Sequence, residues 1–285
     1  MANKISWAFF GTGGISVMIL EELKKLDFVP NLIVTTEDKP KGRKMLITPP
    51  DTKVWADKEN IPCIQLKTLR NEESYKTIKE FSIDGFDLFV VASYGKIIPQ
   101  NILDIPKHKT LNVHPSLLPK LRGPSPIISS ILKEDETGVT IMRLDSEMDH
   151  GPILAQEKIN IEWPPYCDEL EKISAKTGAR MLANLMPSWV KGEIKEVEQK
   201  HDLATTCTKI QKTDGELNLN DKPEINLRKI RAFNIWPGAY FFETDKTRIL
   251  VKRARIENGV LIIERIVPEG KKEMEYRDYM RGMKN

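Results

Sequence analysis

Three polar residues near the middle of the chain have the types and spacing of a catalytic group. Asn112 and His114 lie two residues apart in the segment 111–119, and such residues on an extended strand project from the same side. Asp149 follows in an acidic loop, residues 145–151, that we expect to turn between two strands. An amide and an imidazolium can both donate to an oxyanion, and a carboxylate beside the imidazole stabilises the protonated ring. We therefore expect oxyanion chemistry at the edge of a sheet.

This group contains no evident protein nucleophile. Ser116 comes directly after Pro115 and has no neighbouring base in the sequence. The attacking atom therefore has to come from the substrate, which indicates direct acyl transfer onto an amine. Taken singly, each residue has a plainer interpretation, since a lone histidine is usually structural and Asp149 alone could simply cap a turn.

Alternating strands and helices must position these residues. Short apolar runs predict strands, and segments with apolar residues at helical spacing predict helices between them. The strands are expected over 5–10, 32–35, 61–64, 86–92, 137–144 and 153–161, and the helices over 15–26, 52–60, 71–82, 125–133 and 167–191. The alternation predicts an α/β fold with a Rossmann-like, doubly wound, mostly parallel sheet.

The composition changes after the long helix. Residues 191–202 are charged and contain no long apolar run, which indicates a linker. Several short strands with turn signals follow, over 239–243, 248–254 and 260–267, and they are typical of a small β-barrel. The predicted organisation is a catalytic domain at 1–190, a linker at 191–205 and a C-terminal β-barrel at 206–285.

A glycine-rich turn follows the first strand. Gly11, Gly13 and Gly14 resemble part of the dinucleotide fingerprint G-x-G-x-x-G, but Ser16 stands at the position of its last glycine. A nicotinamide enzyme is therefore disfavoured. We expect a tight strand-to-helix turn whose main-chain N–H groups can meet the polar end of a substrate.

Composition excludes several classes of protein. The chain has 285 residues, 30% of them charged, and a net charge of only +3. Its three cysteines are scattered, with no metal-ligand spacing, so neither a disulfide framework nor a metal site is expected. No run is long enough to span a bilayer, and no targeting segment is seen. We expect a monomer in the cytoplasm or an equivalent organellar matrix, without membrane attachment.

Two local clusters of basic residues stand out against this balance. Residues 39–53 contain five cations and one anion, and residues 246–255 contain five cations and no anion. A charge cluster is usually a solvated face, but two clusters in different parts of one chain favour a polyanionic partner.

Together these motifs resemble the folate-dependent formyltransferases. The run 112–119, the run 121–126 and Asp149-x-Gly151 are shared across that superfamily. Narrower features resemble the methionyl-tRNA formyltransferases. The segment 39–45 resembles their basic insertion loop, and the segment 231–238 resembles a signature of their C-terminal domain.

The resemblance implies an activity and a set of site residues. The donor would be 10-formyltetrahydrofolate and the acceptor the α-amine of methionine on initiator tRNA. Asn112, His114 and Asp149 match the catalytic trio. The folate-binding residues would be Ser116, Leu117, Leu118 and Pro119, with Tyr94 and Arg143 as neighbours, and the tRNA-binding residues would be Lys39, Lys41, Arg43 and Lys44.

Two alternatives remain open from the sequence. A sugar-nucleotide N-formyltransferase would share the folate donor and the trio, but a single sugar nucleotide has no need of the basic segment 39–44. A tRNA-binding module without catalysis would keep the basic segment, but the joint presence of Asn112, His114 and Asp149 argues against it.

Overall fold

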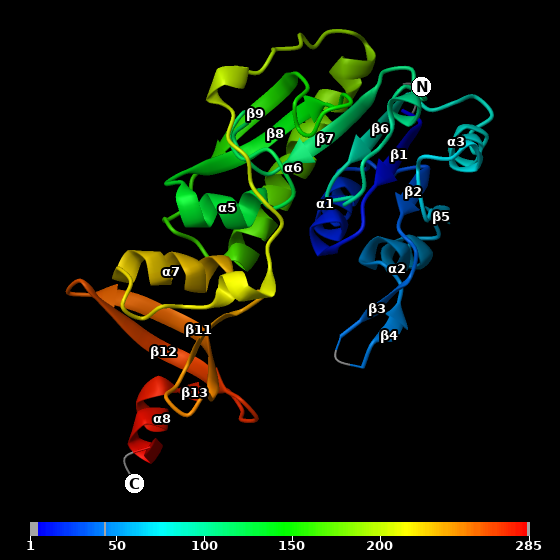
Figure 1. The fold of residues 1–285 in the computed structure, drawn as a ribbon. Helices are drawn as coiled ribbons and strands as arrows, with labels where there is room; N and C mark the ends of the chain where they lie inside the picture. Colours follow the sequence, from blue (N-terminus) through cyan, green and yellow to red (C-terminus); the bar gives the residue numbers. More distant parts are fainter. Residues whose placement is uncertain (1–4, 43, 284–285) are drawn as a thin grey trace. The chain divides into compact units, whose positions relative to one another are not determined.

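The computed structural model describes residues 5–42 and 44–283, which form two compact units (Figure 1). The first unit comprises the chain up to Pro124, Gly138–Ile159 and Lys172–Thr206. The second comprises Ser125–Thr137, Asn160–Glu171 and the chain from Cys207 onward. These compact units divide the chain differently from the predicted boundaries at 190 and 205, because two segments of the predicted catalytic domain, 125–137 and 160–171, pack with the C-terminal residues.

The first unit is built on one seven-stranded sheet. Its strands are β1 (Trp7–Phe10), β2 (Leu32–Thr35), β5 (Cys63–Gln65), β6 (Leu88–Val91), β7 (Thr110–His114), β8 (Thr137–Arg143) and β9 (Ile153–Ile159). They lie in the order β5-β2-β1-β6-β7-β8-β9. The strands from β5 to β7 pair in parallel, and β8 runs antiparallel to β7. The predicted α/β fold with a mostly parallel sheet is confirmed.

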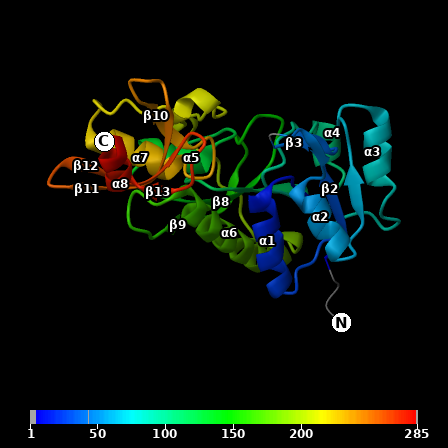
Figure 2. The same cartoon turned by 90° about the horizontal axis from the view of Figure 1, so that it is seen from below.

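Apolar strands and one-sided helices form the core of this unit. Every residue of β1, β2 and β6 is buried, as expected for parallel strands that are covered on both faces. The helices are α1 (Gly14–Lys25), α2 (Asp51–Lys58), α3 (Glu72–Lys79), α4 (Gln100–Leu103) and the part of α6 (Cys167–Val190) that begins at Lys172. Figure 2 shows α1 and α6 side by side along one face of the sheet.

The glycine-rich turn is tied to the sheet by Ser16. The Ser16 hydroxyl donates to the Ala92 carbonyl at 2.7 Å and accepts from the Thr12 N–H at 3.2 Å. A Cβ at Gly11 would lie 2.5 Å from the Phe9 ring and 2.8 Å from Ser16 Cβ. The turn therefore needs a glycine at position 11 for close packing and uses a serine at position 16 to hold it, in agreement with the expected tight turn.

The basic segment, expected to be a loop, forms a hairpin. β3 (Lys39–Lys41) and β4 (Leu46–Thr48) pair antiparallel, with Lys39 opposite Thr48. None of the six residues of the two strands is buried. A strand without a buried face needs no alternation of apolar and polar residues, so the sequence carries no strand pattern here. The hairpin projects from the body of the first unit (Figure 1).

The second unit combines helices with a four-stranded antiparallel sheet. Its regular elements are α5 (Pro126–Lys133), α7 (Pro223–Ala232), β10 (Ala239–Phe242), β11 (Arg248–Glu257), β12 (Val260–Pro268), β13 (Met274–Glu275) and α8 (Tyr276–Met283). The strands lie in the order β10-β11-β12-β13. Arg228 of α7 donates to the carbonyl of Ile131 in α5 at 3.1 Å, which ties α5 to this unit. The prediction for this part of the chain was a small β-barrel, and what the structure shows is a C-terminal domain with an antiparallel sheet of four strands.

Two further observations concern the described residues as a whole. Across 5–42 and 44–283, no helix has the length and apolar content that a membrane crossing requires. The same residues contain no group of three histidine, cysteine or acidic side chains placed to hold a metal ion.

Helix α6 packs closely on β7 at Gly178. A Cβ at this position would lie 2.5 Å from Cγ1 of Val113, the residue between Asn112 and His114. We predict that Gly178→Val lowers the free energy of unfolding by about 1–3 kcal/mol through overpacking, measured by urea denaturation. Gly282→Val in α8 is the control, since a Cβ there meets no atom within 4 Å. Equal stability of the two variants would show that α6 and β7 are not closely packed at Gly178.

Candidate active site

Strand β7 presents two of the predicted catalytic side chains. Asn112 and His114 lie at the carboxyl end of β7 and are only 8% and 3% exposed. We expected them at the edge of the sheet, but β7 lies inside it, paired with β6 and β8. The strand direction reverses at the β7–β8 pair, and ligands of open α/β sheets bind beyond the carboxyl ends of strands. The position is therefore interior to the sheet, at the strand end where ligands of such sheets bind.

The structure brings Asp149 to this pair. Asp149 Oδ1 lies 3.4 Å from Asn112 Nδ2, which donates to it, and 3.6 Å from His114 Nδ1. Asn112 and Asp149 are 37 residues apart in the sequence. The side chains of Asn112 and His114 converge on the same oxygen of the Asp149 carboxylate. This is the arrangement of amide, imidazole and carboxylate that the sequence predicted.

Two features of the 145–151 loop hold Asp149 in place. Its second oxygen, Oδ2, accepts the Gly123 N–H at 2.7 Å, and its backbone adopts a φ of 52°, a left-handed conformation that aspartate tolerates better than most residues. Two residues later, a Cβ at Gly151 would lie 2.0 Å from the Arg143 carbonyl oxygen. The loop therefore closes on the end of β8 only with glycine at 151.

One contact of the His114 ring fixes its tautomer. His114 Nε2 lies 3.0 Å from the Leu121 carbonyl oxygen. A carbonyl oxygen only accepts hydrogen bonds, so Nε2 carries a proton and donates it. The other nitrogen, Nδ1, faces Asp149. With its proton on Nε2 the neutral ring has an acceptor at Nδ1, and only the doubly protonated ring has a donor that faces the space shared with Asn112 and Asp149.

The predicted folate-binding run, Ser116 to Pro119, is held by neighbouring strands. Thr140 Oγ1 of β8 donates to the Ser116 carbonyl at 2.7 Å and accepts from the Leu118 N–H at 3.2 Å. Gln156 Nε2 of β9 donates to the Leu118 carbonyl at 2.9 Å. The Ser116 hydroxyl donates to the Lys120 carbonyl at 2.7 Å, so it serves the local backbone.

The two predicted neighbours of that run differ in their surroundings. Tyr94 is 3% exposed, burial raises the pKa of its phenol, and its hydroxyl has no hydrogen-bond partner among the described residues. Arg143 forms a two-point pair with Glu196, at 2.7 and 2.9 Å, and this pair raises the pKa of the guanidinium. Folate contacts of both residues stay predictions. Glu196 lies in the predicted linker, and nothing in its local sequence marks it as a partner of Arg143.

Side chains of the basic hairpin are accessible. Lys39, Lys41 and Lys44 are exposed, and Lys41 Nζ lies 3.3 Å from Asp51. Arg43, also predicted to bind tRNA, lies outside the described residues. The exposed fractions of Leu46 and Ile47 beside them are 64% and 68%. The described part of the hairpin therefore exposes both cations and apolar side chains.

The second basic cluster is partly neutralised by its own sheet. Arg255 pairs with Glu257 and Glu264, and the Arg248 guanidinium lies 3.9 Å from the centre of the Tyr240 ring. The sequence count for 246–255 missed these glutamates because both lie outside that segment, one of them on the neighbouring strand β12. This cluster is therefore a weaker candidate for binding a polyanion than the hairpin.

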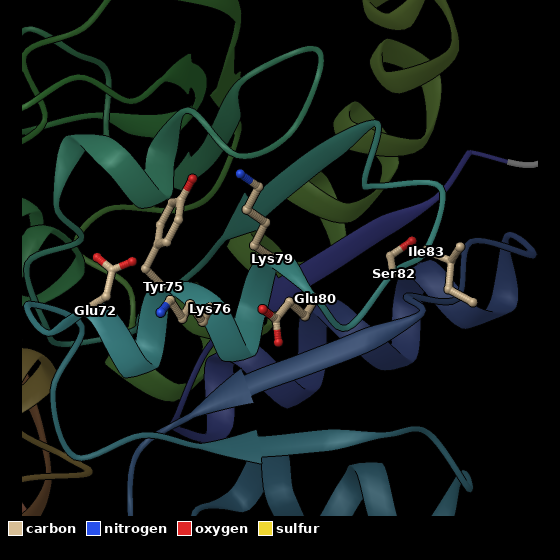
Figure 3. Close-up of a pocket in the computed structure, with 7 residues that line it drawn as sticks. All are labelled: Glu72, Tyr75, Lys76, Lys79, Glu80, Ser82 and Ile83. Atoms are coloured by element: carbon tan, nitrogen blue, oxygen red, sulfur yellow. The ribbon is translucent and has the colours of Figure 1, made fainter.

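Surface hollows do not identify a competing site. One, along α3, is lined by the residues drawn in Figure 3: Glu72, Tyr75, Lys76, Lys79, Glu80, Ser82 and Ile83. Its charged side chains are of both signs, and Lys79 Nζ lies 5.3 Å from the Tyr75 ring centre. Another hollow, in the second unit, is lined by residues that include Trp163 and Arg228. Neither contains a predicted site residue.

The chain is similar to known proteins along most of its length. Residues 3–185 match the family described as formyl transferase, and residues 209–260 match the family described as formyl transferase, C-terminal domain. A methionyl-tRNA formyltransferase of Halalkalibacterium halodurans is 33% identical over 299 aligned positions, which cover 96% of this chain and 93% of that protein.

Solved structures share the fold. A methionyl-tRNA formyltransferase from Clostridium thermocellum superposes with a TM-score of 0.62 at 17% identity, covering 93% of this chain and 98% of that one. A sugar N-formyltransferase from Shewanella sp. superposes with a TM-score of 0.66, also at 17% identity, covering 90% of this chain and 99% of that one. At these identities the superpositions establish the fold and do not choose between acceptors.

Proposed function

Because this chain belongs to the methionyl-tRNA formyltransferase family, we propose that it transfers a formyl group from 10-formyltetrahydrofolate to the α-amine of methionine on initiator tRNA. The observation that carries the proposal is the convergence of Asn112 and His114 on one oxygen of Asp149. The Ser116 hydroxyl is bound to its own loop, so the amine of the acceptor is the nucleophile.

Each member of the trio has a distinct part in the transfer. The bound donor supplies a formyl carbon attached to nitrogen. Asn112 Nδ2 and a proton on His114 Nδ1 donate to the negative charge that develops on the formyl oxygen, because both groups face the same space. Asp149 stabilises the charged imidazole and, through water, relays the proton of the attacking amine to the leaving nitrogen.

The site has features that suit a folate donor. The buried Tyr94 hydroxyl, which lacks a partner among the described residues, is a polar atom that a bound heterocycle can satisfy. The run from Ser116 to Pro119 is fixed by Thr140 and Gln156, so its backbone is preorganised for a ligand. We assign donor binding to this run together with Tyr94 and Arg143.

The exposed hairpin favours tRNA as the acceptor. Lysines on a projecting two-stranded arm can reach phosphates over a distance that one sugar nucleotide does not span. We therefore assign tRNA contacts to Lys39, Lys41, Arg43 and Lys44, acting in the compartment where translation takes place.

A direct assay tests the acceptor. The protein is mixed with 10-formyltetrahydrofolate and either methionyl initiator tRNA or an amino-sugar nucleotide, and formylated product is measured by mass spectrometry. We expect product from the tRNA alone. Product from the sugar nucleotide alone would support the sugar N-formyltransferase instead, and tRNA binding without any product would support a non-catalytic module.

Removing either oxyanion donor should slow turnover. We predict that Asn112→Ala and His114→Ala each lower kcat by about 100–1000-fold, since each removes one hydrogen-bond donor to the developing oxyanion. Single-turnover rates and donor binding are measured separately. Asn101→Ala and His108→Ala are the controls and should keep normal rates. Near-normal turnover in either trio variant would refute this mechanism.

Neutralising the hairpin should weaken tRNA binding and leave donor binding unchanged. We predict that joint replacement of Lys39, Lys41, Arg43 and Lys44 by alanine raises the Kd for tRNA and flattens its dependence on salt, by about one unit of slope for each lost phosphate contact. Filter binding at several salt concentrations measures both quantities. The control replaces four other exposed lysines, Lys58, Lys67, Lys76 and Lys79. Unchanged tRNA affinity would show that the lysines of the hairpin are only solvated and do not contact tRNA.

A further inference from the structure

The segment predicted to be a linker crosses the active-site loops. Val197 exchanges two main-chain hydrogen bonds with Ile153, at 2.8 and 2.9 Å, just after the 145–151 loop. Farther on, the Thr205 side chain accepts from the Leu121 N–H, and its carbonyl accepts from the Arg122 N–H, both at 2.9 Å. We call residues 196–206 the strap. It is attached to both loops that contact the trio.

Gln199 is the centre of the strap. Its side chain is 4% exposed, and all of its amide groups are used. Nε2 donates to the Asp149 carbonyl at 2.9 Å and to the Gly151 carbonyl at 2.7 Å. Oε1 accepts from Nε and Nη2 of Arg122, at 3.1 and 2.7 Å. One glutamine therefore joins the loop of Asp149 to the loop of Arg122.

Arg122 determines which way the Gln199 amide points. A guanidinium has only donors, so the amide oxygen must face Arg122 and the amide hydrogens must face the two carbonyls. The same Arg122 Nη2 lies 2.8 Å from His201 Nδ1, which keeps the guanidinium against the strap. The orientation of the glutamine is thus fixed by chemistry and not by packing alone.

Both loops joined by Gln199 supply contacts to the trio. Leu121 and Gly123 lie on either side of Arg122. The Leu121 carbonyl accepts from His114 Nε2, and the Gly123 N–H donates to Asp149 Oδ2. On the other loop, Gln199 holds the carbonyl of Asp149 itself. Any loss of the Gln199 amide therefore frees the backbone of the carboxylate and loosens the loop that orients the imidazole.

We infer that Gln199 is a positioning residue for formyl transfer, which acts through Asp149. It sets the distance between the Asp149 carboxylate and the two oxyanion donors without touching the reacting atoms. The expected effect of Gln199 on kcat rests on the proposed function. Its structural part, that Gln199 orders the two loops, stands on the hydrogen bonds alone.

Gln199→Met tests the inference because methionine has similar length and lacks both the amide donors and the acceptor. We expect kcat to fall about 10–100-fold while the KM values for tRNA and donor change less than about twofold, since displacement of a catalytic group by about 1 Å has effects of this size. Amide hydrogen exchange should rise in residues 121–123 and 145–151 and stay unchanged in β1 and β6.

A double-mutant cycle separates positioning from general destabilisation. If Gln199 acts through Asp149, Gln199→Met should have little further effect on kcat in an Asp149→Asn background. Gln65→Met is the matched control, because the Gln65 amide also donates to a main-chain carbonyl, that of Thr36 at 3.1 Å. We expect Gln65→Met to leave kcat unchanged both in the wild-type protein and in the Asp149→Asn background.

The outcomes distinguish failure of the inference from failure of the proposed function. Wild-type protein that formylates neither acceptor refutes the proposed function, and hydrogen exchange then still tests the ordering of the loops. Normal kcat and normal exchange in Gln199→Met overturn the inference, as does a kcat loss that is fully additive with Asp149→Asn. Should Gln199→Met fail to fold, Arg122→Lys, which removes the two-point hold on Gln199 and keeps the charge, must show the same coupling to Asp149.

Discussion

The arrangement of this site depends on the different partners of the two carboxylate oxygens of Asp149. One oxygen accepts the Gly123 N–H at 2.7 Å, and this leaves the other facing Asn112 and His114. A carboxylate that is fixed at one oxygen cannot rotate away from its partners at the other. Two further features fix the loop of Asp149. Gly151 packs closely against β8, and the backbone of Asp149 is left-handed. Together they hold this surface loop in a defined position at the end of a buried strand.

The active site is therefore assembled from a rigid part and a supported part. Asn112 and His114 belong to a buried interior strand and move only with the sheet. Asp149 and the Leu121–Gly123 segment lie on loops, and the strap holds both loops through Gln199 and Thr205. A preorganised oxyanion site needs this support, because donors stabilise developing charge only when they are already in place. The chain between the helix α6 and the C-terminal unit thus supports both loops that contact the proposed trio.

Some features were readable from residue types and spacing. The apolar runs at 5–10, 32–35 and 86–92 predicted strands, and the structure has buried strands within them because parallel strands are covered on both faces. The expected tight turn at the first glycines is present, and Ser16 ties it to the sheet. The hairpin at 39–48 was not predicted as strands, because its exposed residues carry no periodic signal. The pairing of Arg143 with Glu196 was missed for a different reason, since ion pairs between distant segments leave no local pattern.

The sequence alone supplied the chemistry that we propose for this protein: an amide, an imidazole and a carboxylate, a substrate-borne nucleophile, and a basic arm for a polyanion. Those conclusions depend on side-chain types and short-range spacing, which the sequence states directly. Tertiary structure decided which atoms meet: that His114 donates through Nε2 to Leu121, that Gly123 holds Asp149, and that Gln199 joins the two loops. These contacts use main-chain groups, which every residue carries, or partners far apart in the chain. Their positions are therefore set by the path of the folded backbone and not by the identity of neighbouring residues.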